Sequence, residues 1–263
     1  MVNKCSGFKY IVVFNYAKKT NFERDKSMNQ ELASIIKIYS IGSHKELSNY
    51  LIGKSKDTLI GTLVDLLTMY INDKNSSTIR EFITVNLAGY EHKEGKIGYN
   101  GFKQDTFISG KTLKCEAKPK NFDTEEFEKY KRKERKTSPA KLNGGGNFTD
   151  YTPVRLTKDK DEKDLNMLVS GFVDGKLIYI IEFPFAFQDF VNNLNKKIQK
   201  WQEKLKGSKS IKGQFLRSAD FDYKDFIECP NLEIIYLLSK DELAKYETCI
   251  SKDFYKFLVE KAK

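Results

Sequence analysis

The sequence predicts an α/β (α+β) fold, with a mixed central sheet flanked by helices and a helical N-terminal part. Three observations support this prediction. Apolar residues recur mostly at helical spacing up to residue 90, and two later segments have the pattern of β-hairpins. A long amphipathic helix, a buried strand and a closing helix follow them. We therefore expect one domain over residues 1–263, with a mainly helical part over 1–90 and a core over 91–263.

Several helices are expected in the N-terminal part. The first carries apolar residues at helical spacing: Leu32, Ile35, Ile36 and Tyr39. Ser43 is suited to cap a short second helix, and Asp57 precedes a longer amphipathic one. Thr78 and Glu81 have the spacing of a capping box, so a fourth helical segment ends near Gly89. The β-branched residues of that segment leave a strand open as the alternative.

Two hairpins are predicted from their turns. Gly110-Lys111 suits a two-residue hairpin turn, with glycine at the position where φ is positive. Such a turn pairs Ser109 with Thr112, and the strand register that follows places Asp105 directly opposite Glu116. Asp174-Gly175, between two apolar runs, is a stronger hairpin signal. The second of these runs is nearly continuous in apolar residues, so we expect a central strand that is covered on both faces.

The remaining segments are assigned by periodicity and composition. We expect a charged helix over 123–136, a glycine-containing loop over 137–158, a long amphipathic helix over 187–205, a buried strand over 232–238 and a closing helix over 241–262. Basic residues gather toward the end of the charged helix, where the helix dipole favours them.

The composition favours anionic partners. Lys and Arg number 46 against 36 Asp and Glu, which gives a formal net charge of +10. Nucleic acid is the leading candidate, and an acidic membrane surface is the second. The four cysteines are scattered without metal-binding spacing, so we expect reduced thiols in a cytoplasmic protein. No apolar run approaches the roughly 20 residues of a membrane span.

The segment Glu116-Ala117-Lys118 is the strongest chemical signal. Three other segments have the same Glu-x-Lys spacing: Glu91-His92-Lys93, Glu94-Gly95-Lys96 and Glu134-Arg135-Lys136. Only around Glu116 do apolar and charged residues alternate as in a strand. The predicted register also brings Asp105 opposite Glu116. Facing carboxylates destabilise a sheet unless a cation lies between them, so this pair indicates a divalent-cation site or, alternatively, a solvated edge hairpin.

Asp105, a ten-residue spacer and Glu116-Ala117-Lys118 resemble the PD-(D/E)xK nuclease superfamily, whose best-known members are type II restriction endonucleases. The resemblance spans about residues 80–185 and implies a restriction-endonuclease-like core. It implies that Asp105 and Glu116 bind Mg²⁺ and that Lys118 orients or activates the attacking water. The Ala117 carbonyl is a further ligand by the same resemblance. Gln104 stands where the family often has proline.

Related nucleases often take an additional acid from the helix before these strands. Glu91 and Glu81 are the residues that the resemblance makes candidates for that role, although either could instead belong to a charged loop. His92 is a candidate general base or a surface histidine. Glu182 is a carboxylate inside an apolar strand, where it either approaches the active site or lies exposed at the strand end.

The loop over 137–158, called the glycine-rich loop because it contains Gly144, Gly145 and Gly146, is a candidate DNA contact. Its glycines allow close approach of backbone to a ligand, and it lacks the residues and context of a P-loop. Residues with hydrogen-bonding side chains suited to bases or phosphates flank these glycines in the sequence. The residues proposed to contact DNA are Asn143, Gly145, Asn147, Thr149, Tyr151 and Arg155, together with Arg132 in the basic run of the charged helix. A plain flexible connector is the alternative.

These features predict a Mg²⁺-dependent endonuclease of restriction type that cuts double-stranded DNA at a short specific sequence. Because such sites are palindromic, we expect a homodimer. A cognate DNA methyltransferase is the expected functional partner, since the host genome must be spared. The alternatives are a structure-specific repair or recombination nuclease and a non-catalytic nucleic-acid-binding protein.

Overall fold

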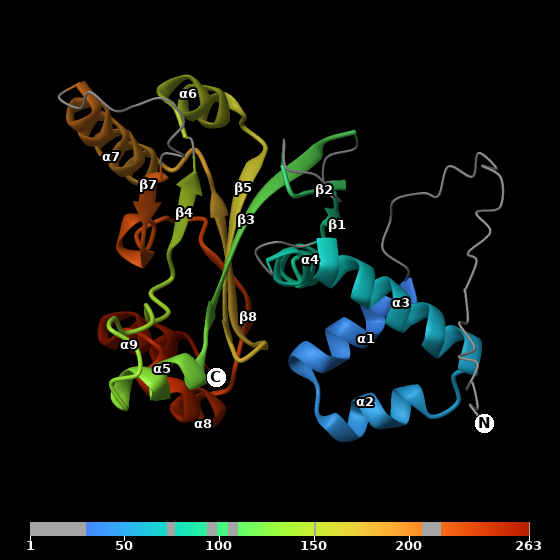
Figure 1. Ribbon diagram of the computed structural model, residues 1–263. Helices are drawn as coiled ribbons and strands as arrows, with labels where there is room; N and C mark the ends of the chain where they lie inside the picture. Colours follow the sequence, from blue (N-terminus) through green and yellow to red (C-terminus); the bar gives the residue numbers. More distant parts are fainter. Residues whose placement is uncertain are drawn as a thin grey trace, which may run out of the picture.

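The computed structural model describes residues 30–72, 77–93, 99–104, 110–149, 151–206 and 217–262. Its centre is a mixed six-stranded sheet with helices on both faces (Figure 1), which confirms the predicted fold class. The strands lie in the order β1 (Glu91–His92), β2 (Gly101–Gln104), β3 (Thr112–Phe122), β5 (Leu165–Val173), β6 (Lys176–Pro184) and β8 (Glu233–Leu237). A two-stranded sheet pairs β4 (Gly146–Thr149) with β7 (Arg217–Phe221).

Strand β3 joins the two halves of the large sheet. It pairs antiparallel with β2 on one side and parallel with β5 on the other. The predicted second hairpin is confirmed, because β5 and β6 pair antiparallel with φ of 48° at Asp174 and 81° at Gly175. Both strands are buried along nearly all of their length, as expected for central strands.

The described residues of the N-terminal part form α1 (Gln30–Ile41), α2 (His44–Leu51), α3 (Lys56–Asn72) and α4 (Thr78–Leu87). The fourth segment is therefore a helix and not a strand. Ser43 caps α2 as predicted, since its hydroxyl accepts from Glu46 N and the Glu46 carboxylate accepts in return from Ser43 N. Asp57 lies within the first turn of α3, whose start is capped by the Ser55 hydroxyl.

Helices α1 and α4 cover one face of the large sheet. Their buried apolar residues pack against those of β5 and β6: Leu32, Ile36 and Ile83 against Phe172, Leu177 and Ile180. Further along α4, Val85 and Ala88 pack against Cys115 and Ala117 of β3. One face of β3 is therefore apolar, and its charged residues point to the other.

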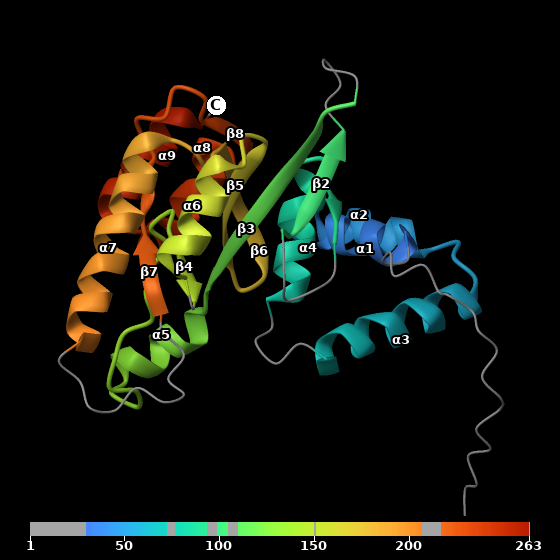
Figure 2. The same cartoon turned by 90° about the horizontal axis from the view of Figure 1, so that it is seen from above.

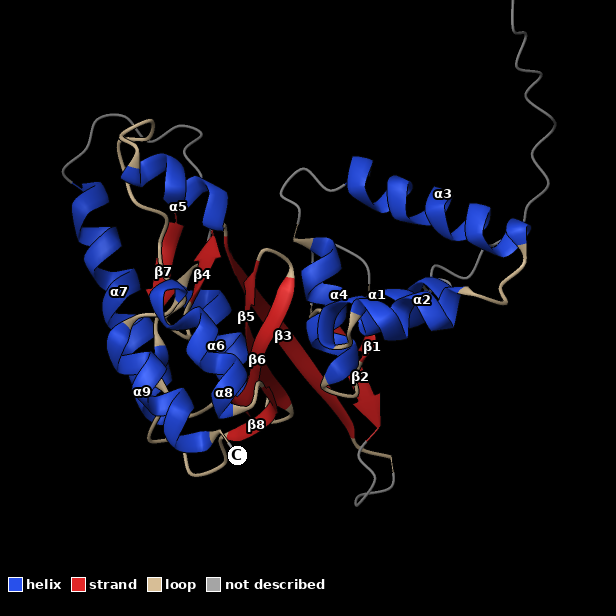
Figure 3. Ribbon diagram, turned by 90° about the horizontal axis from the view of Figure 1, so that it is seen from below, coloured by secondary structure: helices blue, strands red, loops and turns tan. Residues whose placement is uncertain are grey.

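The other face is covered by the C-terminal helices (Figures 2 and 3). The long helix α7 buries Phe190, Val191, Leu194 and Ile198 of its predicted apolar face, whereas Trp201 is exposed. The helices of this layer are α5 (Thr124–Lys131), α6 (Pro153–Asp161), α7 (Gln188–Lys206), α8 (Lys240–Leu243) and α9 (Lys252–Lys261), with 3₁₀ turns at Tyr223–Asp225 and Ala244–Cys249. Every helix within the described ranges is too short or too polar to cross a bilayer.

Three predicted boundaries are wrong. The charged helix ends at Lys131, and the closing segment is divided into α8, a 3₁₀ turn and α9. The predicted loop over 137–158 contains β4 and the start of α6. Thr152 caps α6 ahead of a proline at its first position. Strand β4 forms because β7, far along the chain, pairs with it, and local periodicity cannot reveal such a partner.

Candidate active site

Glu116 and Lys118 lie together on the charged face of β3. They are two residues apart on one strand, so their side chains share a face. Lys118 Nζ donates to Glu116 Oε1 at 2.5 Å, and Glu116 is only 7% exposed. The opposite face carries Cys115 and Ala117, both fully buried under α4. Because side chains alternate between the two faces of β3, the strand itself places the Glu116 carboxylate beside the Lys118 ammonium.

The predicted register of the first hairpin is wrong. Gln104 lies opposite Thr112, and Gly101 lies opposite Cys115. Gly110-Lys111 is therefore not a two-residue turn between paired strands, although Gly110 has the positive φ of 84° that was predicted. Asp105 lies outside the described residues. In the described ladder, Gln104 is paired at the opposite end from Cys115, the neighbour of Glu116.

Packing against α4 explains the register. A Cβ at Gly101 would lie 2.5 Å from Val85 Cγ1 and 3.0 Å from Cys115 Sγ, so only glycine fits opposite Cys115 beneath the helix. This tertiary requirement overrides the short-range preference of Gly110-Lys111 for a tight turn.

Asn100 is a site residue that the sequence reasoning missed. Its side-chain Oδ1 accepts from Ala117 N at 2.8 Å, and its Nδ2 donates to Glu81 Oε2 at 3.2 Å. Asn100 N also donates to Cys115 O at 2.8 Å. The candidate acid Glu81 on α4 is thus linked through one amide to the main chain between Glu116 and Lys118. Asn-Gly just before a strand was the available signal, since asparagine often bonds to neighbouring backbone.

Glu91, the other candidate acid, is not brought to this site. It is exposed on β1, which is separated from β3 by β2. Two strand spacings amount to about 10 Å. Of the two candidates, the structure connects only Glu81 to β3.

The donor types around Glu116 fit a magnesium ion. Within the described ranges no three His, Cys, Asp or Glu residues come close enough to hold a metal. Mg²⁺ commonly uses only one or two protein carboxylates, with waters and phosphate completing its shell. Glu116 supplies one carboxylate, Ala117 a main-chain carbonyl, and Glu81 lies one amide away. The position of Asp105 is not described.

The glycine-rich loop meets β3 beside Lys118. A Cβ at Gly146 would lie 2.7 Å from Lys118 Cβ, and Lys118 Nζ lies 4.7 Å from the centre of the Phe148 ring. Asn143 Oδ1 accepts from Lys120 Nζ at 3.0 Å. Figure 2 shows β3 running between the N-terminal and the C-terminal helices, with β4 on the C-terminal side. Two motifs that are separate in the sequence are therefore neighbours.

The other residues predicted to contact DNA differ in their surroundings. Asn147 and Thr149 are exposed on β4, on either side of buried Phe148. Gly145 is buried and packs against the backbone of β7. Arg132 is exposed beyond α5, where it pairs with Glu134 at 2.7 Å.

Tyr151 and Arg155 form a small cluster with Asp159 of α6. Tyr151 is 2% exposed, and its hydroxyl donates to Asp159 at 2.7 Å. Burial, followed by this hydrogen bond, raises the pKa of Tyr151. The Arg155 guanidinium lies 5.3 Å from the Tyr151 ring centre and 3.6 Å from Asp159, and its side chain is half-exposed. Tyr151 therefore orients Arg155, and only Arg155 of these two is accessible.

Glu182 is buried on the sheet face opposite to Glu116. It is 5% exposed and accepts from Tyr90 Oη at 2.5 Å and from Asn166 Nδ2 at 2.6 Å. Lys103 Nζ lies 3.6 Å away. Both interpretations from the sequence are wrong, because Glu182 is neither exposed nor beside Glu116. It ties β1 and β2 to the central strands.

His92 packs its ring edge-on against Phe82, with centroids 5.6 Å apart. Burial lowers the pKa of His92. The imidazole therefore binds a proton more readily in the unfolded chain than in the folded one. The free energy of unfolding is undiminished above about pH 6.5 and decreases as the pH falls below it. We expect His92→Gln to flatten this acid-side loss in urea unfolding at a series of pH values. His44→Gln on α2 is the matched control, and equal profiles for wild type and His92→Gln would contradict the expectation.

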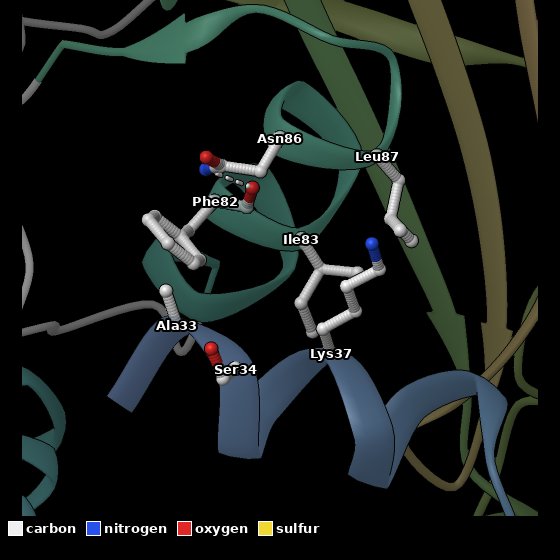
Figure 4. Close-up of a pocket in the computed structure, with 7 residues that line it drawn as sticks. All are labelled: Ala33, Ser34, Lys37, Phe82, Ile83, Asn86 and Leu87. Carbon is white, nitrogen blue, oxygen red and sulfur yellow. Dashed lines mark hydrogen bonds between the residues drawn. The ribbon is translucent and has the colours of Figure 1, made fainter. Parts of the chain in front are cut away.

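The pocket in Figure 4 is not part of this site. It has a volume of about 200 Å³ and lies between α1 and α4. Its lining contains one ionisable side chain, Lys37, and Asn86 is occupied by its bond to Phe82 O at 2.9 Å. The pocket therefore offers no set of groups for acid, base or metal chemistry.

No protein-family model matches the chain, and no curated protein matches its sequence.

Proposed function

We propose that the protein is a Mg²⁺-dependent endonuclease of the PD-(D/E)xK superfamily. Its proposed reaction is hydrolysis of double-stranded DNA at a short specific sequence, as in type II restriction endonucleases. The observation that carries the proposal is the Glu116–Lys118 pair on β3, with the glycine-rich loop packed beside Lys118. A buried carboxylate next to a lysine suits phosphodiester hydrolysis because the reaction needs a metal ligand and a cation near the phosphate.

Each site residue has a role in the proposed hydrolysis that follows from its chemistry. Glu116 and the Ala117 carbonyl would hold the metal, with Asp105 or Glu81 as the second acid. A Mg²⁺ ion held there would polarise the phosphate and acidify a water molecule. Lys118, held in place by Glu116 and by the Phe148 ring, stabilises negative charge that develops on the phosphate oxygens. Asn100 keeps the main chain of Ala117 in position.

The charge of the chain supports a DNA substrate. The formal net charge is +10, and lysines that neutralise phosphates supply most of the affinity for a nucleic acid. Exposed Asn147 and Thr149, with half-exposed Arg155, offer donors for bases or phosphates near the site. We place the reaction in the cytoplasm, where a restriction enzyme would meet incoming DNA beside its cognate DNA methyltransferase.

We further infer that the protein acts as a homodimer, because a palindromic site is matched by a two-fold assembly. Four large apolar side chains are exposed on α3, a type of surface by which protein copies associate: Leu59, Ile60, Leu63 and Val64. Light scattering coupled to gel filtration should give twice the chain mass. A single-chain mass at all concentrations, with and without DNA, would contradict the dimer.

The decisive experiment incubates the wild-type protein with linear duplex DNA in Mg²⁺, with EDTA as the metal-free control. Discrete fragments support the restriction function. Cleavage confined to flaps, junctions or mismatches would favour the repair or recombination alternative. Salt-dependent DNA binding without cleavage in any divalent metal would favour the non-catalytic alternative. A DNA methyltransferase encoded by a neighbouring gene would add independent support.

A further inference from the structure

The charged face of β3 carries a row of alternating residues. Lys114, Glu116, Lys118 and Lys120 follow one another at two-residue intervals, so their side chains share one face. Two of the three lysines are neutralised by carboxylates. Lys114 pairs with Glu162 at 2.6 Å, and Lys118 pairs with Glu116 at 2.5 Å.

Lys120 differs from the other two lysines of this row. Its Nζ donates to the neutral amide oxygen of Asn143 at 3.0 Å, and no carboxylate of the described residues forms an ion pair with it. Burial lowers the pKa of Lys120, and the nearby Asp222 opposes that effect. Lys120 is therefore a lysine without a carboxylate ion-pair partner among the described residues, on a half-buried side chain beside the candidate active site.

Asn143 is held in a fixed orientation. Lysine donates only, so the Asn143 atom that accepts from Lys120 is Oδ1 and the two hydrogens of Nδ2 remain as donors. The backbone of Asn143 accepts from Tyr223 N at 3.1 Å. The neighbouring Leu142 N and O bond to Cys249 O and Ser251 N at 3.0 and 2.8 Å. The loop thus presents an amide donor and an ammonium donor together.

We propose that Lys120 and Asn143 form a phosphate-binding subsite beside the Glu116–Lys118 pair, which holds a DNA phosphate next to the one that is attacked. This inference rests on the proposed function. Lys118 and Lys120 are two residues apart on a strand, about 6.6 Å, a separation comparable with that of neighbouring phosphates on one DNA strand. A cation and an amide donor are the groups that commonly position a phosphate without reading its base. The subsite would fix the register of the strand over Glu116 and Lys118.

The test measures binding of a fluorescein-labelled mixed-sequence DNA duplex by anisotropy, in EDTA, over a series of salt concentrations. Each phosphate contact contributes about 0.9 to the slope of log affinity against log salt. Lys120→Gln is expected to lower the magnitude of that slope by about 1 and to weaken binding. Lys120→Arg should retain the slope. Lys37→Gln removes an exposed lysine on α1, across the sheet, and should leave the slope unchanged.

Asn143→Asp is the second variant, and it keeps the lysine in place. A carboxylate at this position would neutralise Lys120 and repel phosphate, so binding should weaken at least as much as in Lys120→Gln. Thermal melting checks that each variant is folded. Wild-type affinity and slope in both variants would overturn the subsite. Because binding is measured without metal, failure of the wild type to cleave DNA in Mg²⁺ would overturn the nuclease function alone.

Discussion

Lys118→Met is expected to lower the rate of DNA cleavage by about 10²- to 10³-fold, the cost of removing one group that stabilises developing charge. Methionine keeps an unbranched apolar stem, so packing against Gly146 is retained while the ammonium over the Phe148 ring is removed. Single-turnover cleavage of a plasmid in Mg²⁺ gives the rate. Binding of the same DNA should weaken much less, because only one of many cations is removed.

Lys114→Met is the matched control. Lys114 lies on the same face of the same strand and also pairs with a carboxylate, Glu162 at 2.6 Å, yet it lies outside the proposed site. Its variant should cleave DNA within a few-fold of wild type. Undiminished cleavage by Lys118→Met, or equal losses in both variants, would remove the basis for assigning the chemistry to Lys118.

Substitution of the acids tests the metal site in the same assay. Glu116→Gln keeps the shape of the side chain and removes its charge, so cleavage should be lost while the fold is retained. Asp105→Ala and Glu81→Gln then show which carboxylate acts with Glu116. Loss of cleavage in Asp105→Ala would support the predicted ligand, and loss in Glu81→Gln alone would assign the second acid to α4.

Gly145→Ala is expected to destabilise the fold by about 3 kcal/mol, an effect at the upper end for overpacking in a rigid site. A Cβ at Gly145 would lie 2.0 Å from Phe221 O and 3.0 Å from Asp222 Cα, and both are backbone atoms. No side-chain rotation relieves such a clash, so β4 must separate from β7. The midpoint of urea unfolding measures the change.

Gly61→Ala is the control for this prediction. Gly61 lies within α3, and nothing lies within 4 Å of the position of its Cβ. Alanine should raise stability there by up to about 1 kcal/mol, because it favours the helix. An unchanged unfolding midpoint in Gly145→Ala would contradict the packing role. Weak DNA binding by a destabilised Gly145→Ala would reflect the fold and not a lost DNA contact.

Local patterns predicted the elements better than their partners. The capping residues around Ser43, the Asp174-Gly175 turn and the apolar stripe of α7 are all determined within a few residues, so the sequence suffices for them. The turn at Gly110-Lys111 was interpreted by the same reasoning and gave the wrong register. There the space under Val85 of α4 decides the pairing through Gly101.

The sequence by itself determined that Glu116 and Lys118 share the charged face of a strand, because side chains alternate along any strand whatever its partner. Only the tertiary structure decided what surrounds that pair. The Asn100 bridge to Glu81, the contact of Gly146 with Lys118 and the bond from Lys120 to Asn143 each join segments from different parts of the chain. Such contacts depend on strand register and on helix packing over the whole sheet, and no local periodicity encodes them.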